Sequence, residues 1–401
     1  MIIFLYCTWP ESSNGYSKIG LQIANFLASK PDVDQIIYFG ITRDSAVNRF
    51  IHPKIYLIDV YAESPKKDPY GEDLIVDKII KHKPDIVFMY NDILVLYRMF
   101  SKISKMNKTF KTYTYIDLVY RNENSELIQY IDQHTDKFFT FTECWKEYLV
   151  TDYKIDPSKI FILYHGLDCA RIYKVEKEKA RAHFQLDPND FIFININRNT
   201  HRKAIDITLR AFVILLKKNI ESMNKLKLFI TGNVEPSSYP IFEILFQESV
   251  RYGLDYQKVK AQILFNIKSL TDFEINYIYN ACDVGINTCF GEGFGLCCLE
   301  HASIGKPQII SKVGGLSDIF DSQHSQLIEP VAKIYNPSAL DSAGGYWEVC
   351  RAEDFAQAMD YYYHHPEKCL ADGEYYRKLL PTKYDWNTIL NEFYEKHILE
   401  K

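Results

Sequence analysis

The sequence predicts an α/β protein with two doubly wound parallel sheets. Short apolar runs alternate with amphipathic stretches along the chain, and this alternation occurs twice. The polar, charge-rich segment Asp168–Asp190 separates the two arrays and has the pattern of a linker. Alternating strands and helices are typical of a parallel sheet covered on both faces. A chain of 401 residues also has room for about two or three domains.

The first array predicts six strands joined mostly by helices. The strands are expected at Ile2–Cys7, Gln35–Phe39, Asp85–Tyr90, Lys111–Ile116, Lys137–Thr142 and Lys159–Tyr164. The helices are expected at Ser17–Ser29, Asp73–His82, Asp92–Lys105, Glu123–His134 and Glu143–Asp152. Proline follows two of these helices, at Pro31 and Pro84, where it ends the helix before the next strand.

The second array begins after the linker. A strand at Phe191–Asn197, a helix at Ala204–Lys217 and a strand at Lys225–Thr231 open it, and the alternation continues through Phe242–Tyr252, Gln262–Phe265, Asp272–Ala281, Val284–Asn287, Gly295–Gly305 and Gln308–Ser311. We therefore expect domains at 1–168 and 169–383, with a C-terminal helix at 384–401 that can cross back to the first domain. Ligands of such sheets bind outside the carboxyl ends of the strands, so two facing domains would bind theirs in the cleft between them.

Composition excludes several classes of protein. The net charge is −5, from 47 bases and 52 acids, which argues against broad nucleic-acid binding. No run of 18 apolar residues is present, so we expect no membrane-spanning segment, and the N-terminus has the pattern of a first strand, not of a signal peptide. Nine scattered cysteines without a C-x-x-C pair indicate a reduced, cytoplasmic protein.

The most informative stretch runs strand, glycine-rich loop and helix, from Gly285 to Glu300. The loop glycines lack Cβ atoms and allow backbone N–H groups to approach a ligand, while the start of the helix favours an anion. A tight turn with two solvated acids would give the same pattern. On a straight helix Glu292 and Glu300 would lie about 12 Å apart, which is too far for a glycosidase pair.

Two further loops carry candidate ligand-binding residues. Asn197–Lys203 places three cations after a strand, a charge pattern that suits a diphosphate, although ordinary surface loops are also basic. Ser12–Ser17 is a polar turn in which Gly15 permits close backbone approach, a weak signal by itself. Asp32-Val33-Asp34 precedes a strand, which is the wrong end for a site, so we infer no metal from it.

The segment Glu292–Glu300 resembles the E-x7-E signature of retaining, GT4-type glycosyltransferases, which have the GT-B fold. Other parts of that family pattern follow in the expected order: the Asn14-Gly15 loop, Thr140–Trp145, His165–Asp168, Arg198 with Lys203, Asn280–Asn287, Gly305–Ile310 and Gly314-Gly315. The resemblance covers nearly the whole chain. The chain also resembles glycosyltransferases of the large chlorella viruses, which would place it in the host-cell cytoplasm.

The resemblance implies a role for each matching residue. Glu292 would contact the transferred sugar, and Arg198 and Lys203 would stabilise the diphosphate leaving group. Glu300 would hold the ribose. The other donor contacts would come from the loop at Gly15, the backbone at Lys268 and Leu270, and the N–H groups of Phe294, Gly295 and Leu296. Many relatives carry His-Asp where this chain has Ile116-Asp117, so Asp117 is the first acceptor-side candidate for catalysis. The alternatives are Tyr115, His165 and His201.

The implied reaction is retaining transfer of a hexose, mannose first, from a nucleotide-diphosphate sugar to a glycan, glycoprotein or other hydroxyl acceptor. GDP-mannose is the favoured donor, with a UDP-sugar as the other option, and neither a metal nor a further cofactor is required. A dinucleotide-dependent oxidoreductase is one alternative. Its glycine fingerprint fits poorly, because Cys298 stands where the last glycine or alanine belongs. A catalytically silent nucleotide-sugar-binding protein is another.

Overall fold

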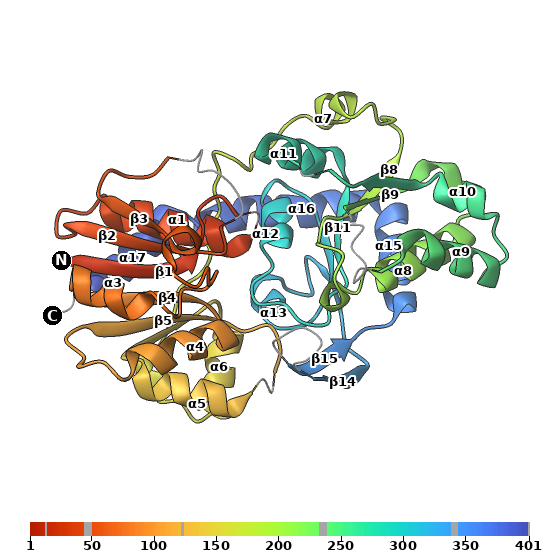
Figure 1. The fold of residues 1–401 in the computed structure, drawn as a ribbon. Helices are drawn as coiled ribbons and strands as arrows, with labels where there is room; N and C mark the ends of the chain where they lie inside the picture. Colours follow the sequence, from red (N-terminus) through yellow and green to blue (C-terminus); the bar gives the residue numbers. More distant parts are fainter. Residues whose placement is uncertain are drawn as a thin grey trace. The chain divides into compact units, whose positions relative to one another are not determined.

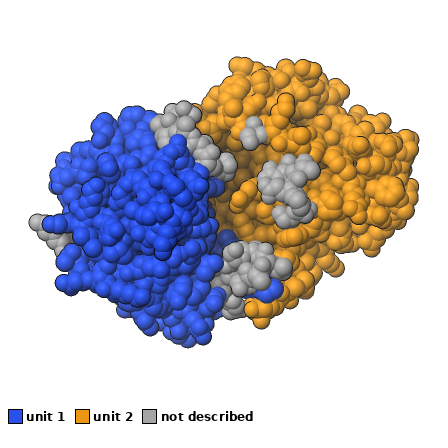
Figure 2. Space-filling model, in the orientation of Figure 1, with its two compact units in different colours: residues 1–165, 336–345, 387–401 blue, residues 166–335, 346–386 orange. Residues whose placement is uncertain are grey.

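The computed structural model describes residues 1–12, 14–43, 50–121, 124–231, 239–268, 270–337 and 344–399. The chain forms two compact units, coloured separately in Figure 2. Unit 1 comprises Met1–His165, Asn336–Gly345 and Asn387–Lys401, and unit 2 comprises Gly166–Tyr335 and Tyr346–Trp386. The sequence analysis predicted domain boundaries after 168 and 383. It did not predict that the range 336–345 belongs to unit 1.

Unit 1 is built on a seven-stranded parallel sheet with the order β3-β2-β1-β4-β5-β6-β7. The strands are β1 (Ile2–Thr8), β2 (Gln35–Ile41), β3 (Ile55–Asp59), β4 (Ile86–Asp92), β5 (Lys111–Asp117), β6 (Lys137–Thr140) and β7 (Ile160–Ile162). The helices are α1 (Gly15–Ala28), α2 (Val60–Glu63), α3 (Ile75–His82), α4 (Ile93–Ile103), α5 (Ser125–His134), α6 (Glu143–Thr151) and most of α17 (Trp386–Phe393) (Figure 1). The strand order reverses between β1 and β4, which makes that point the ligand-binding edge of the sheet.

All six strands predicted for the first array are confirmed within two residues at each end. The sequence analysis missed β3, a short strand at the edge of the sheet whose exposure alternates irregularly. From the far end of the chain, Phe393 packs its ring against Phe88 and Phe139, with centroid distances of 5.7 and 5.1 Å. The Tyr113 hydroxyl donates to the carbonyl of His397 at 2.8 Å. The C-terminal residues therefore complete the core of unit 1.

Unit 2 is built on a six-stranded parallel sheet with the order β10-β9-β8-β11-β12-β13. The strands are β8 (Phe191–Asn195), β9 (Leu226–Thr231), β10 (Ile263–Asn266), β11 (Val284–Asn287), β12 (Gln308–Ser311) and β13 (Gln326–Ile328), with a separate pair, β14 (Ala332–Asn336) and β15 (Gly345–Val349). The helices are α7 (Lys177–His183), α8 (Ile205–Lys218), α9 (Ile241–Arg251), α10 (Tyr256–Lys260), α11 (Asp272–Ala281), α12 (Leu296–Ser303), α13 (Leu316–Ile319), α15 (Ala352–His364) and α16 (Pro366–Lys383). Among the helices of the described ranges, none is both long and apolar enough to cross a bilayer.

Helices cover both faces of the unit 2 sheet, as expected for a doubly wound fold. Along β8, Phe193 packs into one apolar cluster, with α8 and α15, while Ile192 and Ile194 pack into the other, with α11. This alternation follows from the pleat of the strand, which points successive side chains to opposite faces. The strand order reverses between β8 and β11, so the loops that follow these two strands lie at the switch point of the sheet.

The segment 168–190 is not the plain linker that its polar composition predicted. It contains α7, which packs against α11 on one face of the sheet. Arg181 is only 1% exposed and donates to Asp283 at 2.8 Å and to the carbonyl of Ala281 at 2.9 Å. The linker prediction was wrong because composition does not distinguish a buried arginine from a solvent-exposed one. Arg181 can be buried because an ion pair and carbonyl groups satisfy its guanidinium group.

Candidate functional site

The switch point of unit 2 brings together two loops that the sequence separates by about ninety residues. The loop 196–204 follows β8 and leads into α8, and the loop 288–295 follows β11 and leads into α12. β8 and β11 are hydrogen-bonded neighbours, with Ile194 opposite Gly285. The predicted cation loop and the predicted glycine-rich loop therefore start side by side at the carboxyl edge of one sheet.

A buried ion pair joins the two loops. Lys203 and Glu292 are each 8% exposed, and the Lys203 ammonium donates to the Glu292 carboxylate. Arg202 places Nη1 3.6 Å from the same carboxylate and donates to the carbonyl of Gly291 at 2.8 Å. Burial by itself would raise the pKa of Glu292, but the charges of Lys203 and Arg202 outweigh it and hold that pKa at about 2. Glu292 is therefore ionised at neutral pH.

Buried hydrogen bonds hold the cation loop in place. The Thr288 hydroxyl donates to the carbonyl of Ala204 at 2.9 Å and lies 2.8 Å from the hydroxyl of Thr208. The Phe290 N–H donates to the carbonyl of Arg202 at 2.9 Å. Ala204 itself has φ +46°, a left-handed conformation that is unfavourable for a residue with a Cβ. The loop after β11 thus fixes the backbone that carries Lys203.

Two glycines allow close packing around the start of α12. Gly295 has φ +96°, and a Cβ there would lie 2.4 Å from Leu316 Cδ2. A Cβ on Gly315 would lie 2.2 Å from the carbonyl oxygen of Gly293, and the Gly315 N–H donates to the carbonyl of Glu292 at 3.1 Å. Within the described ranges, no backbone acceptor takes the N–H groups of Gly295 and Leu296. Free N–H groups at a helix N-terminus favour a bound anion.

The other residues predicted to bind the donor differ in their surroundings. Arg198 is exposed, and its side chain makes no ion pair with any described residue. Phe294 is buried, with its ring 5.7 Å from that of Tyr384. Glu300 is half-buried on α12 and accepts a hydrogen bond from the Tyr279 hydroxyl at 3.1 Å.

Two predicted residues lie further from this centre. Lys268 and Leu270 follow β10, which is two strands away from β8 in the sheet. Lys268 is exposed, and its carbonyl accepts from the Asn266 side chain at 2.7 Å. The structure therefore brings the loops of Lys203, Glu292 and Gly295-Leu296 together at the switch point. It leaves Lys268 and Leu270 further out along the same sheet edge.

In unit 1, the predicted residues Gly15 and Asp117 lie at its own switch-point edge. Gly15 is the first residue of α1, and the hydroxyl of the next residue, Tyr16, donates to the Asp117 carboxylate at the end of β5. Burial, followed by the charges of Asp117 and Asp92, raises the pKa of Tyr16 well above its usual value. Ile116 is fully buried and, by strand alternation, faces away from Asp117. Ile116 therefore takes no part in this edge.

Sequence reasoning counted Arg202 in the cation patch without predicting its contact, and it assigned no role to Tyr16 or Tyr279. Arg202 binds the Glu292 loop, Tyr16 binds Asp117 and Tyr279 binds Glu300. Arg202 and Tyr16 are chain neighbours of predicted residues, yet nothing in a loop sequence shows which neighbour points inward. Tyr279 is on a separate helix, and only tertiary structure brings it near Glu300.

The model of the family "Glycosyl transferases group 1" matches residues 176–378, half of the chain. The chain belongs to this family. Among curated proteins, a D-inositol 3-phosphate glycosyltransferase 2 of Catenulispora acidiphila is 26% identical over 182 residues, covering 45% of this chain and 41% of its own. One from Rhodococcus jostii is 27% identical over 188 residues, covering 47% and 40%. The matched region thus spans about two fifths of the length of these relatives.

Solved structures resemble the whole chain. Sucrose-phosphate synthase of Thermosynechococcus elongatus has a TM-score of 0.77 at 16% identity, and Anabaena Alr3699/HepE in complex with UDP and glucose has 0.71 at 13%, each with 98% of both chains covered. The glycosyltransferase WaaG has 0.67 at 15%, again with 98% of both chains covered. At these identities the likeness concerns the fold, and the expected GT-B fold of two Rossmann-like domains is confirmed.

Proposed function

We propose that this protein transfers a hexose from a nucleotide-diphosphate sugar to a hydroxyl acceptor, with retention of anomeric configuration. The observation that carries the proposal is the buried Lys203–Glu292 pair beside the unpaired N–H groups at the start of α12. Membership of the glycosyl transferases group 1 family supports the reaction class. The two loops combine a fixed positive field with one ionised carboxylate, which suits a sugar attached to a diphosphate.

The proposed chemistry follows from where charge develops. Departure of a nucleoside diphosphate leaves negative charge on phosphate and positive charge on the sugar. Lys203, the exposed Arg198 and the N–H groups of Gly295 and Leu296 would stabilise the first charge as it grows. Glu292 would accept hydrogen bonds from the sugar hydroxyls. Because these groups supply the positive field, the proposed reaction needs no metal, and we expect full activity in excess EDTA.

For the donor, we propose GDP-mannose first and a UDP-sugar second. The family resemblance of the sequence favours the first, whereas the Anabaena neighbour was solved with UDP and glucose. Acceptor recognition is assigned to Asp117 and Tyr16 of unit 1, where a carboxylate and a phenol could bind a glycan hydroxyl. A cytoplasmic location and a viral source stay predictions of the sequence.

Calorimetric titration with GDP, UDP, ADP and NAD in parallel tests the proposal. Selective binding of GDP or UDP is the expected result and names the base of the donor. Binding of NAD alone would instead favour an oxidoreductase, and binding of none of the four would contradict the assignment of the two loops. Hydrolysis or transfer of the matching sugar nucleotide must then be observed, since binding without turnover would indicate a catalytically silent protein.

A further inference from the structure

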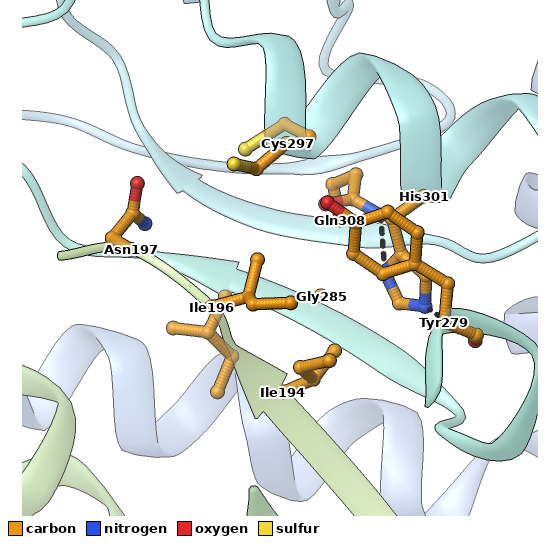
Figure 3. A pocket seen from close by; sticks show the side chains of 10 residues that line it. Ile194, Ile196, Asn197, Tyr279, Gly285, Cys297, His301 and Gln308 are labelled. Atoms are coloured by element: carbon orange, nitrogen blue, oxygen red, sulfur yellow. Dashed lines mark hydrogen bonds between the residues drawn. The ribbon is translucent and has the colours of Figure 1, made fainter. Parts of the chain in front are cut away.

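Three buried polar side chains, those of Tyr279, His301 and Gln308, form a connected network in unit 2 (Figure 3). The Gln308 amide lies 3.1 Å from His301 Nδ1, and His301 Nε2 lies 3.1 Å from the carbonyl of Tyr279. The imidazole also stacks on the Tyr279 ring at a centroid distance of 5.2 Å. The Tyr279 hydroxyl then donates to Glu300 at 3.1 Å. The network thus runs from β12 through α12 to α11 and ends at a carboxylate.

The protonation states give every hydrogen bond a direction. Burial lowers the pKa of His301 to about 3, so the ring is neutral at physiological pH. Nδ1 therefore accepts from the Gln308 amide, and Nε2–H donates to the Tyr279 carbonyl. Burial, together with neighbouring Cys297 and Glu300, raises the pKa of Tyr279 well above its usual value, which keeps its hydroxyl a donor.

The surroundings leave no room for a ligand within the network. A Cβ on Gly285 would lie 2.2 Å from Gln308 Oε1, so glycine at this strand position makes space for the Gln308 side chain. The cavity beside Tyr279, walled by Asn197 and Cys297, has a volume of about 10 Å³, which suffices for roughly one water molecule (Figure 3). The network therefore has room for a water molecule but not for a ribose, and its contact with Glu300 is the Tyr279 hydrogen bond.

We propose that Tyr279, with its ring fixed by His301, is a positioning residue that sets the selectivity of the donor site for ribose. This inference rests on the proposed function, in which Glu300 accepts hydrogen bonds from the ribose hydroxyls. A half-buried glutamate samples several rotamers, and a directed hydrogen bond from a buried phenol selects one of them. A preorganised carboxylate discriminates against an analogue that lacks a hydroxyl, because its lone pairs would then lose a partner.

The test compares Tyr279→Phe with Tyr277→Phe, which removes the same atom two residues earlier on α11, where the ring packs against His183 and Phe273. Each protein is titrated with the nucleoside diphosphate that wild type binds and with its 2′-deoxy and 3′-deoxy forms. We expect Tyr279→Phe to bind the riboside about 10-fold more weakly and the deoxy forms almost unchanged, while Tyr277→Phe retains wild-type selectivity. His301→Gln should also reduce the difference in affinity between the riboside and its deoxy forms, but to a smaller extent.

Wild-type ribose selectivity in Tyr279→Phe would overturn the inference while leaving the proposed function intact. An equal loss for the riboside and the deoxy forms would also overturn it, since a purely structural residue behaves in that way. No binding of any nucleoside diphosphate by wild type would overturn the proposed function and this inference with it.

Discussion

The two units have the same doubly wound topology, yet the edges at their switch points carry different chemistry. In unit 2 the edge combines two cations, the buried Lys203 and the partly buried Arg202, with the carboxylate of Glu292 and a glycine-rich loop. In unit 1 the corresponding edge carries a phenol and a carboxylate, Tyr16 and Asp117. The comparison shows that the sheets provide only the position of a site, and the loops decide whether it suits an anion or a neutral hydroxyl.

The two edges also differ in how strongly a substitution there should affect the stability of the fold. Lys203 and Glu292 are almost fully buried and satisfy one another, so removing either one leaves an uncompensated charge in the core. Asp117 is half-buried, so a change there has less effect on folding. Substitutions in the buried Lys203–Glu292 pair should therefore lower stability and activity together, and substitution of Asp117 should lower activity alone.

The largest effect is expected for Lys203→Ala. The buried Glu292 loses the nearer of the two cations that lower its pKa and keeps Arg202 at 3.6 Å. The free energy of unfolding should therefore fall by roughly 3 kcal/mol, and sugar transfer should fall by more than 100-fold. Chemical denaturation and a transfer assay measure the two quantities. The exposed Arg198 provides the matched control, since Arg198→Ala should lower transfer about 10- to 150-fold without changing stability. Unchanged transfer in both variants would contradict the assignment of this cation patch.

Glu292→Gln should reveal the ion pair through its pH dependence. A carboxyl group whose pKa is lowered to about 2 on folding stabilises the protein above its unfolded pKa of 4.5, and this stabilisation is lost as the pH falls toward 2. At pH 7 the variant should be less stable by about 3 kcal/mol. The difference from wild type should close between about pH 5 and pH 2, as measured by denaturation at a series of pH values. A difference independent of pH would argue against the charge pairing.

Asp117→Asn tests the unit 1 side of the comparison. The amide retains an oxygen that can accept from Tyr16 but loses the charge, so transfer to the acceptor should fall about 10-fold while nucleotide binding stays within about 2-fold. Transfer kinetics and calorimetry measure these. Asp85→Asn serves as the control, because Asp85 bonds Ile2 N–H at the opposite end of the same sheet. If Asp117→Asn weakened nucleotide binding and Asp85→Asn did not, Asp117 would belong to the donor-binding site instead.

The smallest effect concerns backbone strain, which both units contain. Lys83 has φ +45° at an exposed turn after α3, remote from the predicted residues of unit 1, whereas Ala204 has φ +46° next to Lys203. Lys83→Gly should raise the free energy of unfolding by about 0.5 kcal/mol without changing transfer. Ala204→Gly should lower transfer because the backbone of Lys203 becomes less restricted. Equal behaviour of the two variants in the transfer assay would show that strain at Ala204 has no functional role.

The sequence predicted the fold well because strand and helix periods are local signals. The apolar runs at Ile2–Cys7 and Val284–Asn287 needed no tertiary information, and β11 was predicted with its observed bounds. The edge strand β3 and helix α7 were missed because their residues are only partly buried or include a buried arginine. Local composition does not show that a charged residue is buried when an ion pair satisfies its charge.

For the site, the sequence predicted which loops carry charge but not how the charges pair. Glu292 and Lys203 were assigned to different parts of a ligand, and the structure shows them bonded to each other. That contact depends on β8 and β11 being neighbours, a consequence of strand order that no local pattern contains. The roles of Tyr16 and Tyr279 likewise come from contacts between separate elements.

The interleaving of the two units along the chain has a consequence for folding during synthesis. Unit 2 has all its residues once position 386 has been made, whereas unit 1, which contains the first strand, still lacks 387–401. Until then, Phe88, Phe139 and Tyr113 lack the partners that Phe393 and His397 provide. The unit that is translated first is thus the one that can be completed last, and in the meantime its aromatic core is exposed to chaperones and to aggregation.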